Sequence, residues 1–145
     1  MIKIRSRIKE SLEQVYSPEE ISSFTNVLCR DMLGINQTDL YLNKERLLSE
    51  EESEKLEDAL IRLRKHEPVQ YILGQAHFYS RTFIVRPSTL IPRPETEELV
   101  DLIIRENQSP RSVLDIGTGS GCIAVSLSLE FPEALVTGCD ISRDA

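Results

Sequence analysis

Tryptophan is absent from this sequence, and cysteine, methionine and glycine are sparse. The 145 residues include three cysteines, two methionines and six glycines. Cys29, Cys122 and Cys139 form no CxxC pair, which excludes a disulfide framework and a cysteine-based zinc site and favours reduced thiols. Glycine and proline together are also too few for a collagen-like or low-complexity chain.

Long apolar runs are missing as well. No stretch approaches the roughly 20 residues that a membrane-spanning helix needs, and the charged first 14 residues lack the apolar region of a secretory signal. We therefore expect a cytoplasmic protein that does not bind membranes. The net charge of −7 argues against binding to duplex nucleic acid through its phosphates, so no direct nucleic-acid contact is expected.

The first half of the chain has the periodicity of short amphipathic helices. Ser17 with Glu20, and Ser49 with Glu52, form capping-box patterns that predict two helix starts. Apolar residues follow at helical spacing. The three stripes contain Ile4, Ile8, Leu12 and Val15; Ile21, Phe24, Leu28 and Met32; and Leu56, Ala59, Leu60 and Leu63. Further short helices are predicted over 38–42 and 69–73, with Gly34 and Gly74 as stop signals. Residues 1–74 are thus predicted to form an all-α bundle.

The pattern changes after Gly74. Aromatic and β-branched residues over 77–79 and 82–85 predict a β-hairpin with Ser80 and Arg81 as its turn. A proline-rich stretch follows, so we assign 75–93 to a hairpin and linker. From Glu95 the helical period resumes. Its apolar residues are Leu99, Leu102 and Ile103.

Residues 94–145 are predicted to begin a Rossmann-like α/β domain. A short apolar strand over 112–116, a glycine-rich turn, a helix over 122–129 and a second strand over 135–140 form a βαβ pattern. Two parallel strands and one helix leave an α/β layer incomplete, because parallel sheets are covered on both faces. We therefore expect the chain to be the front part of a longer α/β protein.

The glycine turn carries the strongest chemical signal. Its sequence runs from Asp115 to Gly121 as DIGTGSG, between the first strand and the helix. Glycines permit a tight turn and a close approach of the ligand, and the helix N-terminus attracts an anion. Asp140, at the end of the second strand, can accept hydrogen bonds from both hydroxyls of a ribose. The third glycine of a dinucleotide fingerprint is replaced by Cys122, and the G-x-G-x-G spacing resembles motif I of methyltransferases that use S-adenosylmethionine.

Several segments together resemble the bacterial release factor glutamine methyltransferases, the PrmC or HemK family. The matching stretches are EPVQYILG (67–74), the aromatic hairpin with Phe78 and Tyr79, LIPRPETE (90–97) and VLDIGTGSG (113–121). The resemblance implies an enzyme that transfers a methyl group from S-adenosylmethionine to the side-chain amide of the glutamine in the Gly-Gly-Gln motif of class 1 peptide-chain release factors. It also implies that residues 1–74 dock the substrate.

Residue roles follow from the same resemblance. The donor loop would be shaped by Gly117, Gly119 and Gly121 and lined by Thr118 and Ser120. Asp115 would lie near the ammonium of the donor. Asp140 would hold the ribose of the donor, and Ile141 would lie beside its adenine. The expected substrate-side residues are Leu90, Pro92, Arg93, Glu95 and Thr96. The family's Asn-Pro-Pro-Tyr motif, which orients the glutamine, is absent from these residues and expected after Ala145. We therefore expect this chain alone to be inactive.

Other interpretations stay open at this point. A DNA adenine amino-methyltransferase shares the donor fold, although the acidic charge speaks against it. A nicotinamide-dependent oxidoreductase is disfavoured by Cys122 in place of the third glycine. A non-catalytic module that docks a release factor is a further possibility. Neither histidine has the spacing of a metal ligand, so no metal site is expected. The thiol of Cys122 either packs in the core or has its pKa lowered by the helix start.

Overall fold

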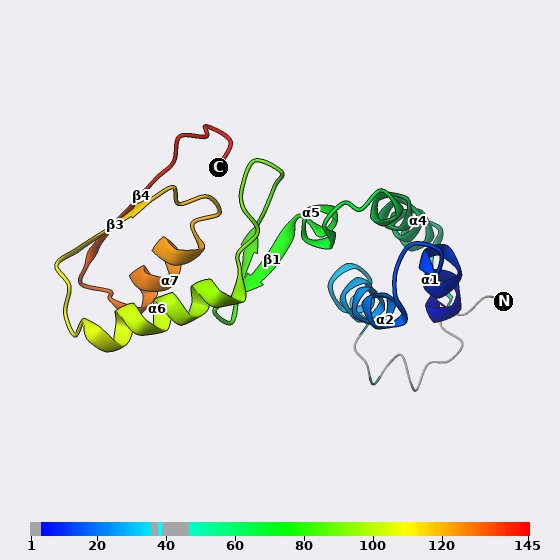
Figure 1. The fold of residues 1–145 in the computed structure, drawn as a ribbon, viewed down its shortest axis with the longest axis horizontal. Helices are drawn as coiled ribbons and strands as arrows, with labels where there is room; N and C mark the ends of the chain where they lie inside the picture. Colours follow the sequence, from blue (N-terminus) through cyan, green and yellow to red (C-terminus); the bar gives the residue numbers. More distant parts are fainter. Residues whose placement is uncertain (1–3, 36–37, 39–46) are drawn as a thin grey trace. The chain divides into compact units, whose positions relative to one another are not determined.

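The computed structural model describes residues 4–35, 38 and 47–145, and the chain divides into two compact units, Met1–Leu73 and Gly74–Ala145 (Figure 1). The first unit is helical. The second contains the strands. The described elements of the first unit are α1 (Ile4–Leu12), α2 (Pro18–Val27), the π-helix η1 (Leu28–Met32), α4 (Glu50–Arg64) and α5 (Val69–Leu73). Those of the second unit are β1 (Gln75–Phe78), β2 (Arg81–Ile84), α6 (Pro94–Glu106), β3 (Ser112–Ile116), α7 (Cys122–Glu130) and β4 (Leu135–Cys139).

Both predicted capping boxes of the helical unit are confirmed. The Ser17 hydroxyl accepts the N–H of Glu20, and the Glu20 carboxylate accepts the N–H of Ser17 at 2.9 Å. Ser49 and Glu52 make the same reciprocal pair at the start of α4. Each pair satisfies two backbone N–H groups that a helix start leaves without a partner.

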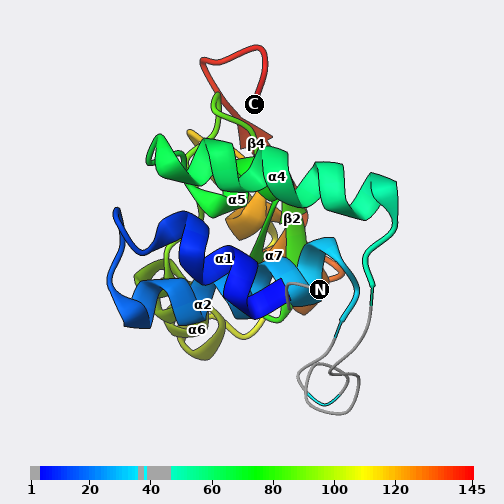
Figure 2. The ribbon, with the colours of Figure 1, turned by 90° about the vertical axis from the view of Figure 1, so that its right-hand side faces the viewer.

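The core of this unit contains the predicted apolar stripes. Its fully buried side chains are Ile8, Leu12, Leu28, Cys29, Leu56, Ala59, Leu60 and Leu63. α1 contacts both α2 and α4, and Figure 2 shows α1 and α2 side by side. Three apolar faces therefore meet in one cluster, as expected for a small bundle.

Two helices end at residues other than those that the apolar periodicity predicts. α1 ends at Leu12, three residues before the end of its predicted stripe, because the N–H groups of Val15 and Tyr16 both donate to the Leu12 carbonyl and close a tight turn. The stripe from Ile21 continues not as one α-helix but as α2 followed by η1, in which the Leu33 N–H reaches back five residues to the Leu28 carbonyl. The helix predicted over 38–42 lies outside the described residues except Thr38.

The predicted hairpin is confirmed, but its turn is not Ser80–Arg81. β1 pairs with β2 so that Phe78 lies opposite Arg81, which leaves Tyr79 and Ser80 as the turn residues. Both have positive φ, 48° and 58°, the conformation that a two-residue hairpin turn of the I′ type requires. The contacts of Tyr79 with α6 account for this choice. Its N–H donates to Glu97 at 2.8 Å and its hydroxyl donates to Asp101 at 2.7 Å.

Of the three apolar residues that mark the helical period of α6, only Ile103 packs against the core. Val100 is fully buried, and Ile103 and Ile104 pack beside it against the core of the second unit. Leu99 and Leu102, by contrast, are 47% and 44% exposed. The spacing of apolar residues allowed either face, and contact with α7 decides which of them is buried.

β3 and β4 pair in parallel, with Ser112 opposite Leu135 and Ile116 opposite Cys139. α7 contacts both strands on one face and also contacts α6, so α7 lies between the strand pair and α6 (Figure 1). The other face carries exposed apolar side chains, among them Leu114, Ile116 and Leu135 at 62%, 78% and 71% exposure. Among the residues that the structure describes, no helix combines the length and apolar character needed to cross a lipid bilayer.

Candidate functional site: the glycine loop at the end of β3 and β4

The glycine loop connects β3 to α7 at the carboxyl end of the strand pair. Gly117, Gly119 and Gly121 have φ values of 77°, 54° and 74°, in the left-handed region where residues with a side chain are disfavoured. The N–H groups of Gly117 and Thr118 donate to the Cys139 carbonyl at 2.7 and 3.0 Å. The loop is therefore tied to the last residue of β4.

Asp140 follows β4 directly and holds the same loop through its side chain. One carboxylate oxygen accepts the N–H of Gly119 at 2.8 Å, and the other accepts the N–H of Ser142 at 2.8 Å. These backbone hydrogen bonds keep the pKa of Asp140 below its ordinary value. Asp140 is exposed and ionised at neutral pH, and a carboxylate has further lone pairs available to a ligand.

Thr118 joins the loop to both strands. Its hydroxyl donates to the carboxylate of Asp115 at 2.8 Å. Its side chain also lies over Gly138 of β4, where an added Cβ atom would be 2.9 Å from Thr118 Oγ1 and 3.2 Å from its Cβ. Gly138 thus provides the space in which Thr118 orients Asp115. Gly138 is not among the site residues expected from the sequence. The available signal was a glycine two residues before the acidic residue at the strand end.

Ser120 and Cys122 lie where the loop enters α7. The Ser120 hydroxyl is buried and, among the described residues, has no hydrogen-bond partner beyond the weakly bonding thiol of Cys122. Cys122 itself is buried, and its burial raises the pKa of the thiol. Backbone N–H groups at the helix start do act to lower this pKa, as suggested, but burial outweighs them and the net shift is upward. Packing accounts for Cys122.

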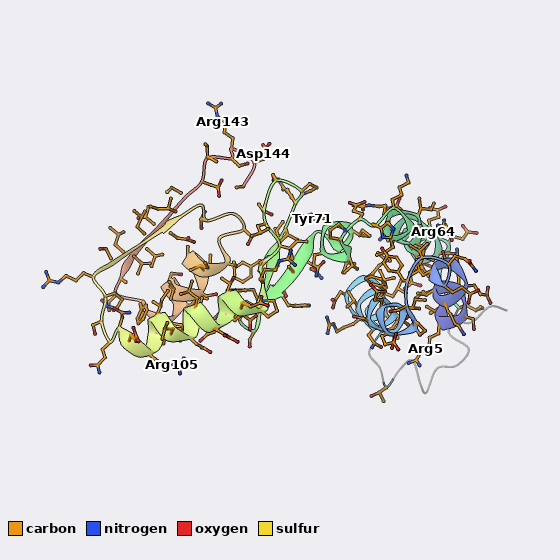
Figure 3. All side chains as sticks on the ribbon, in the orientation of Figure 1. Arg5, Arg64, Tyr71, Arg105, Arg143 and Asp144 are labelled. Carbon is orange, nitrogen blue, oxygen red and sulfur yellow. The ribbon has the colours of Figure 1, made fainter. Side chains whose placement is uncertain are left out.

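The proline-rich segment reaches the same edge of the strand pair. A Cβ atom on Gly119 would lie 4.0 Å from the backbone nitrogen of Leu90, so this segment runs alongside the glycine loop. The Ser88 hydroxyl donates to the carbonyl of Asp144 at 2.9 Å. Asp144, labelled with Arg143 in Figure 3, lies in the segment that follows β4. Three segments distant in sequence therefore converge at the end of β3 and β4.

The other predicted substrate-side residues lie along the same segment. Pro92 is half-buried beside the buried Ile91, whereas Leu90 is 73% exposed. Arg93 is the N-cap residue of α6, and its side chain makes no capping hydrogen bond. Arg93 and Glu95 are exposed and Thr96 is half-buried. Leu90 is therefore brought beside the glycine loop, while Arg93, Glu95 and Thr96 are placed at the start of α6.

The two histidines make contacts of a structural kind. His66 ends the turn after α4 with φ of 60° and packs edge-on against Tyr16. His77 is exposed in β1, where its Nδ1 lies 3.2 Å from the Thr82 hydroxyl. Over the described residues, no group of three His, Cys, Asp or Glu side chains could hold a metal ion.

A parallel βαβ unit with a glycine loop and an acidic residue after its second strand defines the class. The β3–α7–β4 part of the second unit is the beginning of a Rossmann-like domain, and a helical domain and a β-hairpin precede it in the sequence. The comparisons then identify the family. Residues 3–74 match the family model described as the PrmC N-terminal domain. The chain belongs to the release factor glutamine methyltransferase (PrmC) family and corresponds to its N-terminal portion.

Similar proteins with this name occur in several bacteria. The release factor glutamine methyltransferase of Bacteroides thetaiotaomicron is 50% identical over 145 residues, which are 100% of this chain and 52% of that protein. Its namesake from Flavobacterium psychrophilum is 40% identical over 97% of this chain and 51% of its own length. That of Streptococcus pneumoniae is 44% identical over 92% of this chain and 48% of its length. The chain thus spans about half the length of the curated relatives it matches.

Proposed function

We propose that this chain supplies the substrate-docking domain and the first part of the donor site of a methyltransferase. The enzyme would transfer a methyl group from S-adenosylmethionine to the glutamine side chain of the Gly-Gly-Gln motif in class 1 release factors. In this proposal residues 1–74 dock the substrate, 75–93 link the domains and 94–145 begin the donor domain. The names of the relatives support the reaction. The contact between the glycine loop and Asp140 supports the donor site.

The residues at the end of β3 and β4 fit a donor that combines a nucleoside with an amino acid. An added Cβ on Gly117 would meet nothing within 4 Å, so the main chain of the loop is accessible to a ligand. The α7 N-terminus carries a partial positive charge that suits a carboxylate. Asp140 would accept hydrogen bonds from the ribose hydroxyls, with Ile141, which is fully exposed, beside the adenine. Asp115, oriented by Thr118, would face the ammonium, and Ser120 would donate to the donor from the loop.

The proline-rich segment would form the wall between donor and substrate. Leu90 is exposed and adjacent to the loop, which suits contact with the apolar stem of a glutamine. Pro92 would keep this wall rigid, because its ring restricts the backbone. Arg93, Glu95 and Thr96, at the start of α6, would contact the substrate side.

Methyl transfer from this donor depends mainly on the alignment of the two reactants. The donor, when bound, supplies a methyl group on a sulfonium, and the neutral thioether S-adenosylhomocysteine is a good leaving group. A glutamine amide nitrogen is a poor nucleophile, so positioning and exclusion of water become the main contributions. An Asn-Pro-Pro-Tyr motif, which the family resemblance assigns to holding this amide, does not occur in the 145 residues. We therefore expect the chain alone to bind the donor without transferring its methyl group.

Thermal melting with added ligands tests the donor site. S-adenosylmethionine and S-adenosylhomocysteine should raise the melting temperature of the chain, because a ligand that binds the folded state stabilises it. Asp140→Ala should abolish this shift. Asp144→Ala is the matched control, since Asp144 is an exposed residue of the same segment and its hydrogen bonds with Ser88 and Ser142 use its backbone.

Other ligands identify the alternatives. A shift with a nicotinamide dinucleotide in place of S-adenosylmethionine would contradict the donor assignment. Salt-sensitive binding to duplex DNA would favour an adenine methyltransferase. A radiolabelled methyl-transfer assay with a class 1 release factor should show no turnover by this chain. Robust turnover would contradict the expectation that these 145 residues are inactive alone.

A further inference from the structure

An open groove runs between α1 and α2 of the helical unit, and its floor is apolar. Tyr16, Ile21 and Thr25 form this floor. The Thr25 hydroxyl donates to the Ile21 carbonyl at 2.7 Å, and the Tyr16 hydroxyl donates to the Leu63 carbonyl at 2.7 Å. Both hydroxyls are thus bonded within the unit, and the Tyr16 ring packs edge-on against Phe24 and His66.

The two rims of the groove differ in charge. Arg5 (labelled in Figure 3) and Lys9 lie four residues apart on α1 and therefore on one side of that helix. Ser22 and Asn26 have the same spacing on α2 and carry no charge. Glu13, just beyond the end of α1, lies at one end of the groove. A cationic rim is a local exception in a chain whose net charge is −7.

We infer that this groove binds an apolar segment of the protein substrate whose Asp or Glu side chains face Arg5 and Lys9. The inference rests on the proposed function, which makes a release factor the substrate. The lining of the groove as a whole is more apolar than polar, and such a segment would cover this surface, as in peptides that insert a helix face into a groove. Glu13 repels carboxylates at its end of the groove, so the charges also set the direction of the bound segment.

Two kinds of substitution in the full chain test this inference. The double variant Arg5→Glu with Lys9→Glu reverses the charge of the rim. Ser22→Trp places a bulky ring over the groove from an exposed position of α2. Lys65→Glu is the control for charge, because Lys65 is exposed in the same unit and lies outside the groove. Ser23→Trp is the control for bulk, as the exposed next residue of the same helix.

The probe is a purified bacterial class 1 release factor, and the readouts are its affinity and association rate at several chloride concentrations. Rim reversal should weaken binding at least about tenfold, and lower the association rate and its salt dependence, because rim charges act mainly on association. Ser22→Trp should weaken binding by a similar factor. Both controls should stay within about twofold of the unmodified chain. Circular dichroism of each variant checks that the helices remain folded.

Several results would overturn the inference. One is a Ser22→Trp variant that binds the release factor as tightly as the unmodified chain does. Another is a salt dependence that rim reversal leaves unchanged. A third is an unmodified chain that does not bind the release factor. If the unmodified chain self-associates and Ser22→Trp makes it monomeric, a second copy occupies the groove instead. The melting shift with S-adenosylmethionine is measured separately. Failure of the donor site is therefore distinguishable from failure of the groove.

Discussion

Truncation of Leu60 in the helical core tests whether the two units of the chain are stabilised separately. Leu60 is fully buried in the cluster formed by α1, α2, η1 and α4. Replacement of a buried leucine by alanine removes its contacts and leaves a cavity, at a cost of about 3 to 5 kcal/mol. A unit of this size has about 4 to 11 kcal/mol of stability in total. Leu60→Ala should therefore lower its melting temperature by at least about 10 °C.

The matched control is the next residue on the same helix. Ile61 is 39% exposed, so Ile61→Ala removes a similar apolar volume from a site that is partly open to solvent, and its cost should be about 1 kcal/mol, well below that of Leu60→Ala. Far-ultraviolet circular dichroism follows the helices. Tryptophan fluorescence is not an option, since the chain has no tryptophan. The transition that S-adenosylmethionine shifts reports on the unit Gly74–Ala145.

Leu60→Ala should leave that donor-sensitive transition in place, because each unit has a hydrophobic cluster of its own. Equal losses in Leu60→Ala and Ile61→Ala would refute the packing argument. A fall of both transitions together would show that the two units unfold as one, and the separate roles proposed for them would lose their basis.

Other predictions concern the loop and the helix starts. Gly138→Val should abolish the melting shift with S-adenosylmethionine, because its side chain would displace Thr118; a retained shift would remove Gly138 from the site. Donor affinity, followed by calorimetry, should stay constant as the pH falls from about 7 to 5. Backbone hydrogen bonds depress the pKa of Asp140, so its charge is lost only below the ordinary aspartate range. Loss of affinity near pH 6 would contradict this. Ser49→Ala should cost about 1 kcal/mol through loss of the bond to the Glu52 N–H, seen as a lower melting temperature of the helical unit, and an unchanged melt would show that the cap contributes nothing.

Local signals predicted the elements whose causes are local. Ser17 and Ser49 start their helices as predicted because a cap involves only residues within one turn. The strand over 112–116 and the glycine turn after it are also confirmed. Glycines at positive φ and a short apolar run restrict that segment without help from the rest of the chain.

Long-range contacts explain the misses. The hairpin turn falls on Tyr79 and Ser80 because α6 supplies Glu97 and Asp101 as acceptors, which no turn propensity reveals. The buried face of α6 depends on α7 in the same way. At the candidate site, the glycine turn and Asp140 were recognisable as a pattern. Gly138 was not recognisable, because its importance depends on the side chain of Thr118, which comes from the glycine loop and lies over Gly138 in β4. The roles assigned to these residues remain predictions.

The open face of β3 and β4 has a practical consequence for handling the protein. Leu114, Ile116 and Leu135 expose most of their side chains there, and strongly hydrated salts such as sulfate promote the burial of such surfaces. We therefore expect the chain to precipitate early in ammonium sulfate and to remain dispersed in chloride at low protein concentration. Purification and every salt titration described above are best carried out in sodium chloride.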